Sequence, residues 1–405
     1  MFTFFADRVK SLKPSQTIIV ATKAKQMKRD GVDVVDLSLG DPILDPDYPL
    51  PECVKEAGIE AISQSKTSYT AADGIPELRK AIVEKMKRDS NLDYEIENVT
   101  VGCGAKQMIF NSLLATINHG DEVVLGAPYW VSYCDIVELF GGKPVVIETA
   151  LKDSFKITAE ELEAAITEKT KWFIINSPVN PTGAVYTKHE LQAIADVLLK
   201  HPHVNIMSDD IYEYLLLDDD VKFFNIVSVE PKLKDRTVIV NGTAKSHAMT
   251  GWRTGYVVAN KEMVKVLGKL QSQSTTNACT ISQYATIAAL KDGSKSSLSV
   301  VPKIKEKREI VLDLFAKVEG LDAFKPSGAF YVFSSIERLI GKTYKGEVIN
   351  SCGDFCRLLI DEYYVAVTPG AAFGSKNHFR LSLSASENDV RRGAERICEF
   401  VSLIK

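Results

Sequence analysis

The chain has 405 residues, of which 45% are hydrophobic and 25% are charged, and its formal net charge is -4. That length predicts roughly two or three domains rather than one small core. Basic and acidic residues are interspersed along the chain, which argues against a nucleic-acid-binding protein. No stretch reaches the roughly 18 apolar residues that cross a bilayer, and the first residues lack the basic leader of a signal peptide. We therefore expect neither a nucleic-acid partner nor a membrane partner.

Seven cysteines are scattered along the sequence. Their odd number and the absence of paired CxxC motifs or a histidine cluster argue against a disulfide framework or a zinc site, so we predict no metal. Reduced thiols are typical of a cytoplasmic protein, and this is the location that we predict.

Residues 1–50 hold no core of their own and are expected to pack against the C-terminal part of the chain. Gly102 and Gly104 then precede a helix that should run to about Thr116. Beyond it, short apolar stretches predict strands at Glu122–Leu125, Pro144–Ile147, Trp172–Asn176, Val204–Ser208, Thr237–Asn241 and Gly255–Ala259. Amphipathic stretches between them predict helices at Val131–Phe140, Ala159–Ile166, Lys188–Leu199 and Lys261–Lys269. This alternation predicts an α/β fold with a largely parallel sheet covered on both faces.

The C-terminal third predicts a smaller α+β domain. Its expected elements are a helix at Val301–Val318, a strand at Gly328–Phe333, a helix at Cys352–Glu362, a strand at Phe379–Leu383 and a helix at Glu387–Leu403. We therefore divide the chain into an N-terminal segment (1–50), a large domain (51–295) and a small domain (296–405).

Polar residues gather in the loops that follow three of the predicted strands, at Asn176–Gly183, Asp209–Glu213 and Gly242–Gly251. Ligands of open α/β sheets bind beyond the carboxyl ends of the strands. These loops are therefore expected to converge on one site.

The most informative loop contains Lys245, with Arg253 eight residues later. A lone lysine after a buried strand usually reaches the surface, because a charged amine is costly to bury without a partner. Here, however, the whole segment from Val240 to Tyr256 resembles the lysine signature of class I aminotransferases, which are fold-type I pyridoxal-phosphate (PLP) enzymes. The resemblance covers nearly the whole chain and implies a mostly parallel seven-stranded sheet between helices, plus a smaller α+β domain.

The resemblance implies a role for each residue that it matches. Lys245 would form the Schiff base with the cofactor and later shuttle a proton, and Arg253 would clamp the cofactor phosphate. Many members of the family have serine before the lysine, whereas this chain has Ala244. One phosphate contact must then come from elsewhere.

The motif Asp209-Asp210-Ile211-Tyr212 follows a predicted strand. An isolated Asp-Asp pair would most often cap a helix. The resemblance instead places Asp209 against the pyridine nitrogen, where a negative charge favours the protonated ring. It places Tyr212 and Asn180, the latter from a loop like the family's N-P-x-N-P-T-G motif, against the cofactor's O3′.

Further cofactor contacts are implied elsewhere. Unpaired amides at a helix N-terminus suit a phosphate, and the resemblance assigns this role to Gly104, Ala105 and Lys106. Trp130 would stack on the pyridine ring. Tyr69 matches a tyrosine that reaches the phosphate of the neighbouring subunit, which implies a homodimer with shared active sites.

Substrate contacts follow from the same resemblance. Arg380 matches the arginine that binds the α-carboxylate, and Gly40 lies in the segment that closes over the substrate. Trp130 and Asn180 are also implied to contact the substrate. The acid after that glycine is usually glutamate, so Asp41 is a departure. Lys106 matches a lysine that meets a distal carboxylate, which favours dicarboxylic substrates.

The sequence thus predicts transamination between an L-amino acid and a 2-oxo acid, with aspartate and 2-oxoglutarate as the leading pair. Aromatic or prephenate transamination within the same family is the alternative. A C–S β-lyase and a non-catalytic PLP-binding sensor are more distant ones.

Overall fold

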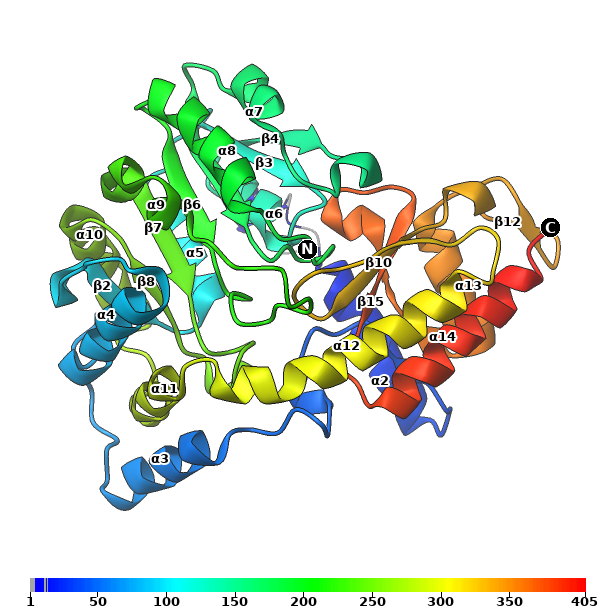
Figure 1. Ribbon diagram of the computed structural model, residues 1–405, viewed down its shortest axis with the longest axis horizontal. Helices are drawn as coiled ribbons and strands as arrows, with labels where there is room; N and C mark the ends of the chain where they lie inside the picture. Colours follow the sequence, from blue (N-terminus) through cyan, green and yellow to red (C-terminus); the bar gives the residue numbers. More distant parts are fainter. Residues whose placement is uncertain (1–3, 11, 13) are drawn as a thin grey trace.

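The computed structural model describes residues 4–10, 12 and 14–405. Its largest sheet has seven strands in the order β2-β8-β7-β6-β5-β3-β4 (Figure 1). These strands are β2 (Val99–Gly102), β3 (Glu122–Ala127), β4 (Lys143–Glu148), β5 (Thr170–Asn176), β6 (Asn205–Asp209), β7 (Thr237–Asn241) and β8 (Gly255–Val258). Neighbouring strands from β4 to β7 pair in parallel, whereas β8 pairs antiparallel with both β7 and β2. The predicted mostly parallel sheet is confirmed.

Helices cover both faces of this sheet, because successive apolar residues of each strand point to opposite sides. In β5, Trp172 and Ile174 belong to one core and Phe173 and Ile175 to the other. The first core is covered by α5 (Ala105–Leu114), α6 (Ser132–Leu139) and α10 (Lys261–Ser272). The second is covered by α4 (Pro76–Ser90), α7 (Ala159–Ala165), α8 (Lys188–Lys200) and α9 (Ile226–Val229).

The C-terminal part contains a second sheet with the strand order β14-β15-β10-β9 and a core of its own. The strands are β9 (Asp322–Phe324), β10 (Tyr331–Ser335), β14 (Thr368–Pro369) and β15 (His378–Ser382). The helices around them are α12 (Lys295–Phe315), α13 (Cys352–Tyr363) and α14 (Glu387–Ser402). In Figure 1, α12 (yellow) runs from the side of the large sheet to this part of the molecule. A short hairpin joins β11 (Thr343–Tyr344) and β12 (Glu347–Val348).

Parts of the N-terminal segment contact the C-terminal part of the chain. After α1 (Asp7–Lys10), α2 (Gln16–Arg29) shares a small core with residues of α13. Strand β1 (Val35–Asp36) pairs with β13 (Val365–Ala366). Helix α3 (Glu52–Ser63) then lies against α11 (Thr280–Asp292).

Two predicted elements need correction. Helix α12 begins at Lys295 rather than Val301, because Pro302 is accommodated inside the helix instead of opening it. Strand β10 begins at Tyr331 rather than Gly328, because Ala329 has a φ of 56°, which interrupts the extended backbone. None of the described helices is long and apolar enough to cross a membrane.

Candidate active site

A cavity of about 350 Å³ lies beyond the carboxyl ends of β5, β6 and β7. Asn176 and Asp209 are the last residues of β5 and β6, and both line it. Every predicted site residue except Tyr69 lines this cavity: Gly40, Gly104, Ala105, Lys106, Trp130, Asn180, Asp209, Tyr212, Lys245, Arg253 and Arg380. The three loops therefore converge, as the sequence predicted.

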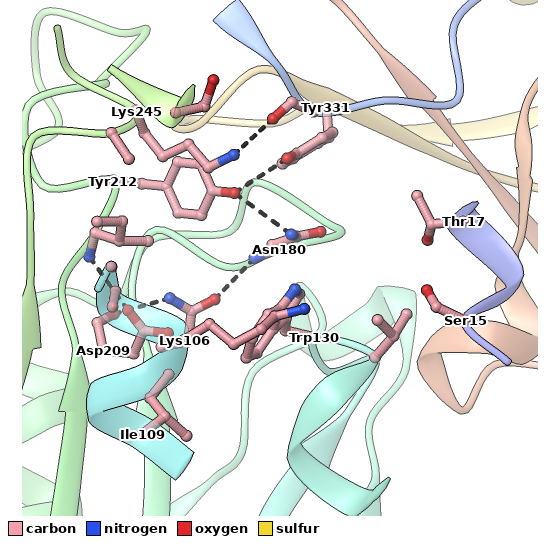
Figure 2. A pocket seen from close by; sticks show the side chains of 18 of the residues that line it. Ser15, Thr17, Lys106, Ile109, Trp130, Asn180, Asp209, Tyr212, Lys245 and Tyr331 are labelled. Carbon is pink, nitrogen blue, oxygen red and sulfur yellow. Dashed lines mark hydrogen bonds between the residues drawn. The ribbon is translucent and has the colours of Figure 1, made fainter. Parts of the chain in front are cut away.

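Lys245 lies in the loop after β7, on the wall of the cavity (Figure 2). Its Nζ donates a hydrogen bond of 2.6 Å to the carbonyl of Gly40, and its own carbonyl accepts one of 2.8 Å from the Tyr48 hydroxyl. The surrounding protein removes water from the ammonium and lowers the pKa of Lys245 to about 8. Near neutral pH this amine therefore has a larger uncharged, nucleophilic fraction than a surface lysine.

Asp209 presents its carboxylate to the cavity from the end of β6. Its Oδ2 accepts a hydrogen bond of 2.6 Å from the hydroxyl of Tyr133, which comes from α6. Burial raises the pKa of Asp209 to about 6, against the opposing effect of the Tyr133 hydrogen bond. A cation placed beside this carboxylate would hold it ionised.

The neighbouring Asp210 does not line the cavity. Its carboxylate accepts hydrogen bonds from the Ser208 hydroxyl at 2.7 Å and from the Asn225 amide at 2.5 Å, and burial raises its pKa to about 8. The two adjacent aspartates thus have different surroundings, and only Asp209 faces the cavity.

Tyr212 and Asn180 lie side by side in the cavity wall. The Tyr212 hydroxyl is 3.0 Å from that of Tyr331 and accepts a hydrogen bond of 3.4 Å from Asn180 Nδ2. Burial raises the pKa of Tyr212 well above its usual value. Its hydroxyl therefore stays protonated and available as a donor.

Arg380 enters the cavity from β15 of the C-terminal sheet. It donates hydrogen bonds to Asn180 Oδ1 at 3.0 Å and to the Ser38 carbonyl at 2.7 Å. The guanidinium lies between the rings of Tyr331 and Phe373, at 4.4 and 4.8 Å from their centroids. Its Nε is buried and has no partner among the described residues. A buried arginine with an unused donor suits an anionic ligand.

The first turn of α5 and Arg253 meet at one end of the cavity. Gly104 caps the helix with a φ of 91°, and a Cβ on it would lie 2.8 Å from Arg253 Nη2. Gly255 is tighter still, since a Cβ there would lie 2.1 Å from the Ala105 nitrogen. The glycines therefore let β8 and Arg253 approach the helix end, whose unpaired amides attract anions.

Lys106 and Trp130 form another wall. Lys106 Nζ lies 4.9 Å from the centroid of the Trp130 ring, and that ring meets Tyr133 edge-on with centroids 5.2 Å apart. Burial, and then the charge of Arg253, lower the pKa of Lys106.

Several residues of the cavity were not predicted. Ser15, Thr17 and Ile18 reach it from the start of α2, and Figure 2 shows Ser15 and Thr17 across the cavity from Lys245 and Tyr212. Nothing in the sequence connects these residues with the distant loops. Tyr133, which does not line the cavity but donates to Asp209, was also missed because it lies on the apolar face of α6. Its position three residues after Trp130 is the one signal that could have pointed to it.

Tyr69 lies outside the cavity and is 87% exposed. It lines a separate surface hollow made by residues 66–69, 276, 277 and 279–281. Within the described residues, no group of three or more histidine, cysteine, aspartate or glutamate side chains is placed to hold a metal ion.

The carboxyl edge of the parallel sheet thus places a buried lysine, a buried acid and groups suited to an anion around one cavity. The chain belongs to the class I and II aminotransferase family, whose model matches residues 32–397. It is 45% identical to the aspartate/prephenate aminotransferase of Cereibacter sphaeroides, over 98% of both chains.

Two solved structures agree with this result. The aspartate aminotransferase of Rhizobium meliloti superposes with a TM-score of 0.94 at 40% identity, covering 100% of both chains. The Thermus thermophilus aspartate aminotransferase with maleate gives a TM-score of 0.90 at 38% identity, covering 98% of this chain and all of that one. The chain is therefore a PLP-dependent aminotransferase, and the predicted fold-type I architecture is confirmed.

Proposed function

We propose that the enzyme transfers the amino group between L-aspartate and 2-oxoglutarate by a ping-pong mechanism through Lys245. The observation that carries this proposal is the presence in one cavity of two cations, Arg380 and Lys106, in addition to Lys245 and Arg253. An amino acid with a second carboxylate would place its α-carboxylate on Arg380 and its side-chain carboxylate on Lys106. The Thermus relative was solved with maleate, which is also a dicarboxylic acid.

We propose that the same cavity holds PLP, because its residues fit each part of that molecule. The α5 amides and Arg253 would receive the phosphate, Asp209 the ring nitrogen, and Tyr212 with Asn180 the ring hydroxyl. Trp130 would lie on the ring face. When bound, PLP supplies an aldehyde that takes up the amino group and a ring that withdraws electrons from the α-carbon.

Side chains of the protein would orient the substrate and transfer its proton. Arg380 would hold the α-carboxylate through its planar fork and so orient the α-carbon toward Lys245. Lys245 Nζ would then remove the α-proton as a general base, a role that its lowered pKa favours. Asp209 would hold a proton on the ring nitrogen opposite its carboxylate. Gly40 would close over the substrate.

Prephenate is a second candidate acceptor. It also carries two carboxylates, and relatives such as the Cereibacter sphaeroides protein are named for both substrates. Assays of purified enzyme with a matrix of amino donors and oxo-acid acceptors, prephenate included, would decide between the candidates.

The Lys106→Ala variant tests the dicarboxylate proposal. Loss of one charge-assisted contact should lower kcat/KM for aspartate by about tenfold to a hundredfold, since such contacts contribute roughly 1.5–3 kcal/mol. The value for phenylalanine, which has no second carboxylate, should change by less than about threefold. Lys265→Ala, on the outer surface of α10, serves as the control. Equal losses for both substrates would contradict the proposal.

We further propose a homodimer in which Tyr69 serves the partner's site. Its high exposure and its position outside its own cavity support this arrangement. The cytoplasmic location stays a prediction that rests on the cysteine pattern; the seven cysteines are unpaired in the structure.

A further inference from the structure

A buried polar cluster lies behind the cavity, where the loops after β6 and β7 meet helix α4. Its central residue is Glu213, which directly follows Tyr212 and is 7% exposed. Asn241 ends β7 four residues before Lys245, and Lys85 extends from α4; each is 1% exposed. None of the three lines the cavity.

Glu213 uses its two carboxylate oxygens for different partners. Oε1 accepts a hydrogen bond of 2.8 Å from Asn241 Nδ2, and Oε2 accepts one of 2.6 Å from Lys85 Nζ. The Asn241 Oδ1 in turn accepts a bond of 2.7 Å from the Gly242 amide, which opens the Lys245 loop. One side chain therefore joins the segment that carries Asp209 and Tyr212 to the segment that carries Lys245.

The surrounding charges show how the buried carboxylate is compensated. Lys85 Nζ is also 3.8 Å from Asp89, which accepts hydrogen bonds from the Tyr214 hydroxyl and from Arg88. Burying such ions costs as much as their attraction returns, and an apolar pair would often serve stability equally well. An apolar pair, however, could not accept the hydrogen bond that Asn241 donates to Glu213.

We propose that Glu213 is a positioning residue for transamination. Its bond to Asn241 fixes the loop of Asp209 and Tyr212 relative to the loop of Lys245, while Lys85 neutralises its charge. The inference rests on the proposed function, because Glu213 would fix the separation between Asp209 and Lys245, the acid and the amine of that reaction.

Two double variants isolate the hydrogen bond from the ion pair. Both Lys85→Met/Glu213→Gln and Lys85→Met/Glu213→Leu remove the buried charges, but only the glutamine can still accept from Asn241. Asn241→Ala removes the same bond from its other end, together with the bond that Asn241 Oδ1 accepts from the Gly242 amide, and keeps the ion pair. Asp218→Asn, which weakens the separate ion pair between the half-buried Asp218 and the buried Arg308, is the control for a general loss of stability.

The first measurement is the pH midpoint at which the absorbance band of bound PLP changes; the others are kcat, KM and Tm. The glutamine double variant should keep the wild-type midpoint and a kcat within about twofold. The leucine double variant and Asn241→Ala should move the midpoint by about half a pH unit or more and lower kcat about tenfold, with less change in KM. Asp218→Asn should lower only Tm.

The positioning role is overturned if the two double variants share one midpoint and one kcat, or if Asn241→Ala behaves like Asp218→Asn. Should the leucine variant fail to fold, Asn241→Ala alone decides. These outcomes leave the proposed function intact. A wild-type enzyme without a PLP band would instead overturn both proposals.

Discussion

Lys245 and Asp209 illustrate how the protein environment adjusts individual residues of the cavity. Burial disfavours the charged form of each, so it lowers the pKa of the amine to about 8 and raises that of the carboxyl to about 6. Each group consequently titrates much closer to neutral pH than it would in water, which is typical of functional sites.

The pKa of Lys245 gives a prediction for cofactor attachment. Only the neutral amine attacks an aldehyde, so the rate at which PLP attaches to the cofactor-free enzyme should rise with pH, with a midpoint near 8, and level off above it. Absorbance after rapid mixing, over a range of about pH 6 to 10, measures this rate. A midpoint near 10.5, the ordinary lysine value, would contradict the prediction. Lys245→Ala should show no attachment.

Tyr133→Phe tests the hydrogen bond to Asp209. Without this donor the pKa of Asp209 should rise above about 6, and more of the carboxyl should be neutral in mildly acidic solution. We expect kcat to fall about tenfold at neutral pH, which corresponds to roughly 1.4 kcal/mol, and to recover as the pH increases. The kcat–pH profile measures the effect. Tyr186→Phe, which alters a buried hydroxyl bonded to the Ile157 amide, should leave the acidic limb of the profile unmoved.

Sequence reasoning predicted that the loops after the strands meet at one edge of a parallel sheet. It reached Asn180, Asp209 and Lys245 within those loops through the family resemblance. It missed Tyr133 and Ser15 for different physical reasons. Tyr133 is an aromatic residue on the core face of a helix, and Ser15 is brought to the cavity by tertiary packing alone.

Among the secondary elements, the contact between β8 and the first turn of α5 controls the shape of the anion-binding end. The Gly255→Ala variant should displace that turn, because its Cβ would lie 2.1 Å and 2.4 Å from backbone atoms of Ala105 and Gly104. We expect a cost of about 1–3 kcal/mol and therefore a rise in the Kd for PLP of roughly fivefold to 150-fold. Titration of the cofactor-free enzyme with PLP measures it. Gly251→Ala, with nothing within 4 Å, is the control, and equal behaviour of both variants would refute the argument.

Element prediction succeeded where an apolar run was long and bounded by polar residues, as in β5. Strand β2 was missed because its residues, Val99–Gly102, include only two apolar side chains, which Thr100 separates. The orientation of β8 was equally beyond the sequence pattern, since an antiparallel strand buried on both faces has the same composition as a parallel one.

At the scale of the whole molecule, the division into a segment at 1–50 and domains at 51–295 and 296–405 stays a prediction, as does the dimer. A subunit-mixing experiment tests the dimer. If Tyr69 serves the partner's site, a hybrid of Lys245→Ala and Tyr69→Phe chains has one site with both changes and one intact site. Its activity should then be about half that of the wild type and exceed that of either variant homodimer. If Tyr69 serves its own subunit, the hybrid should show only half the activity of the Tyr69→Phe homodimer.

Residues near the two ends of the chain meet at the cavity. The Leu37 carbonyl accepts a hydrogen bond from the Ser382 amide, and the Ser38 carbonyl accepts one from the Arg380 guanidinium. Val35 pairs with Val365. The order of synthesis gives this contact a consequence. The segment around Gly40 is synthesised before its β-partner, because Val365 follows Val35 by 330 residues. A nascent chain should therefore be unable to close over a substrate before Val365 and Ser382 have been synthesised.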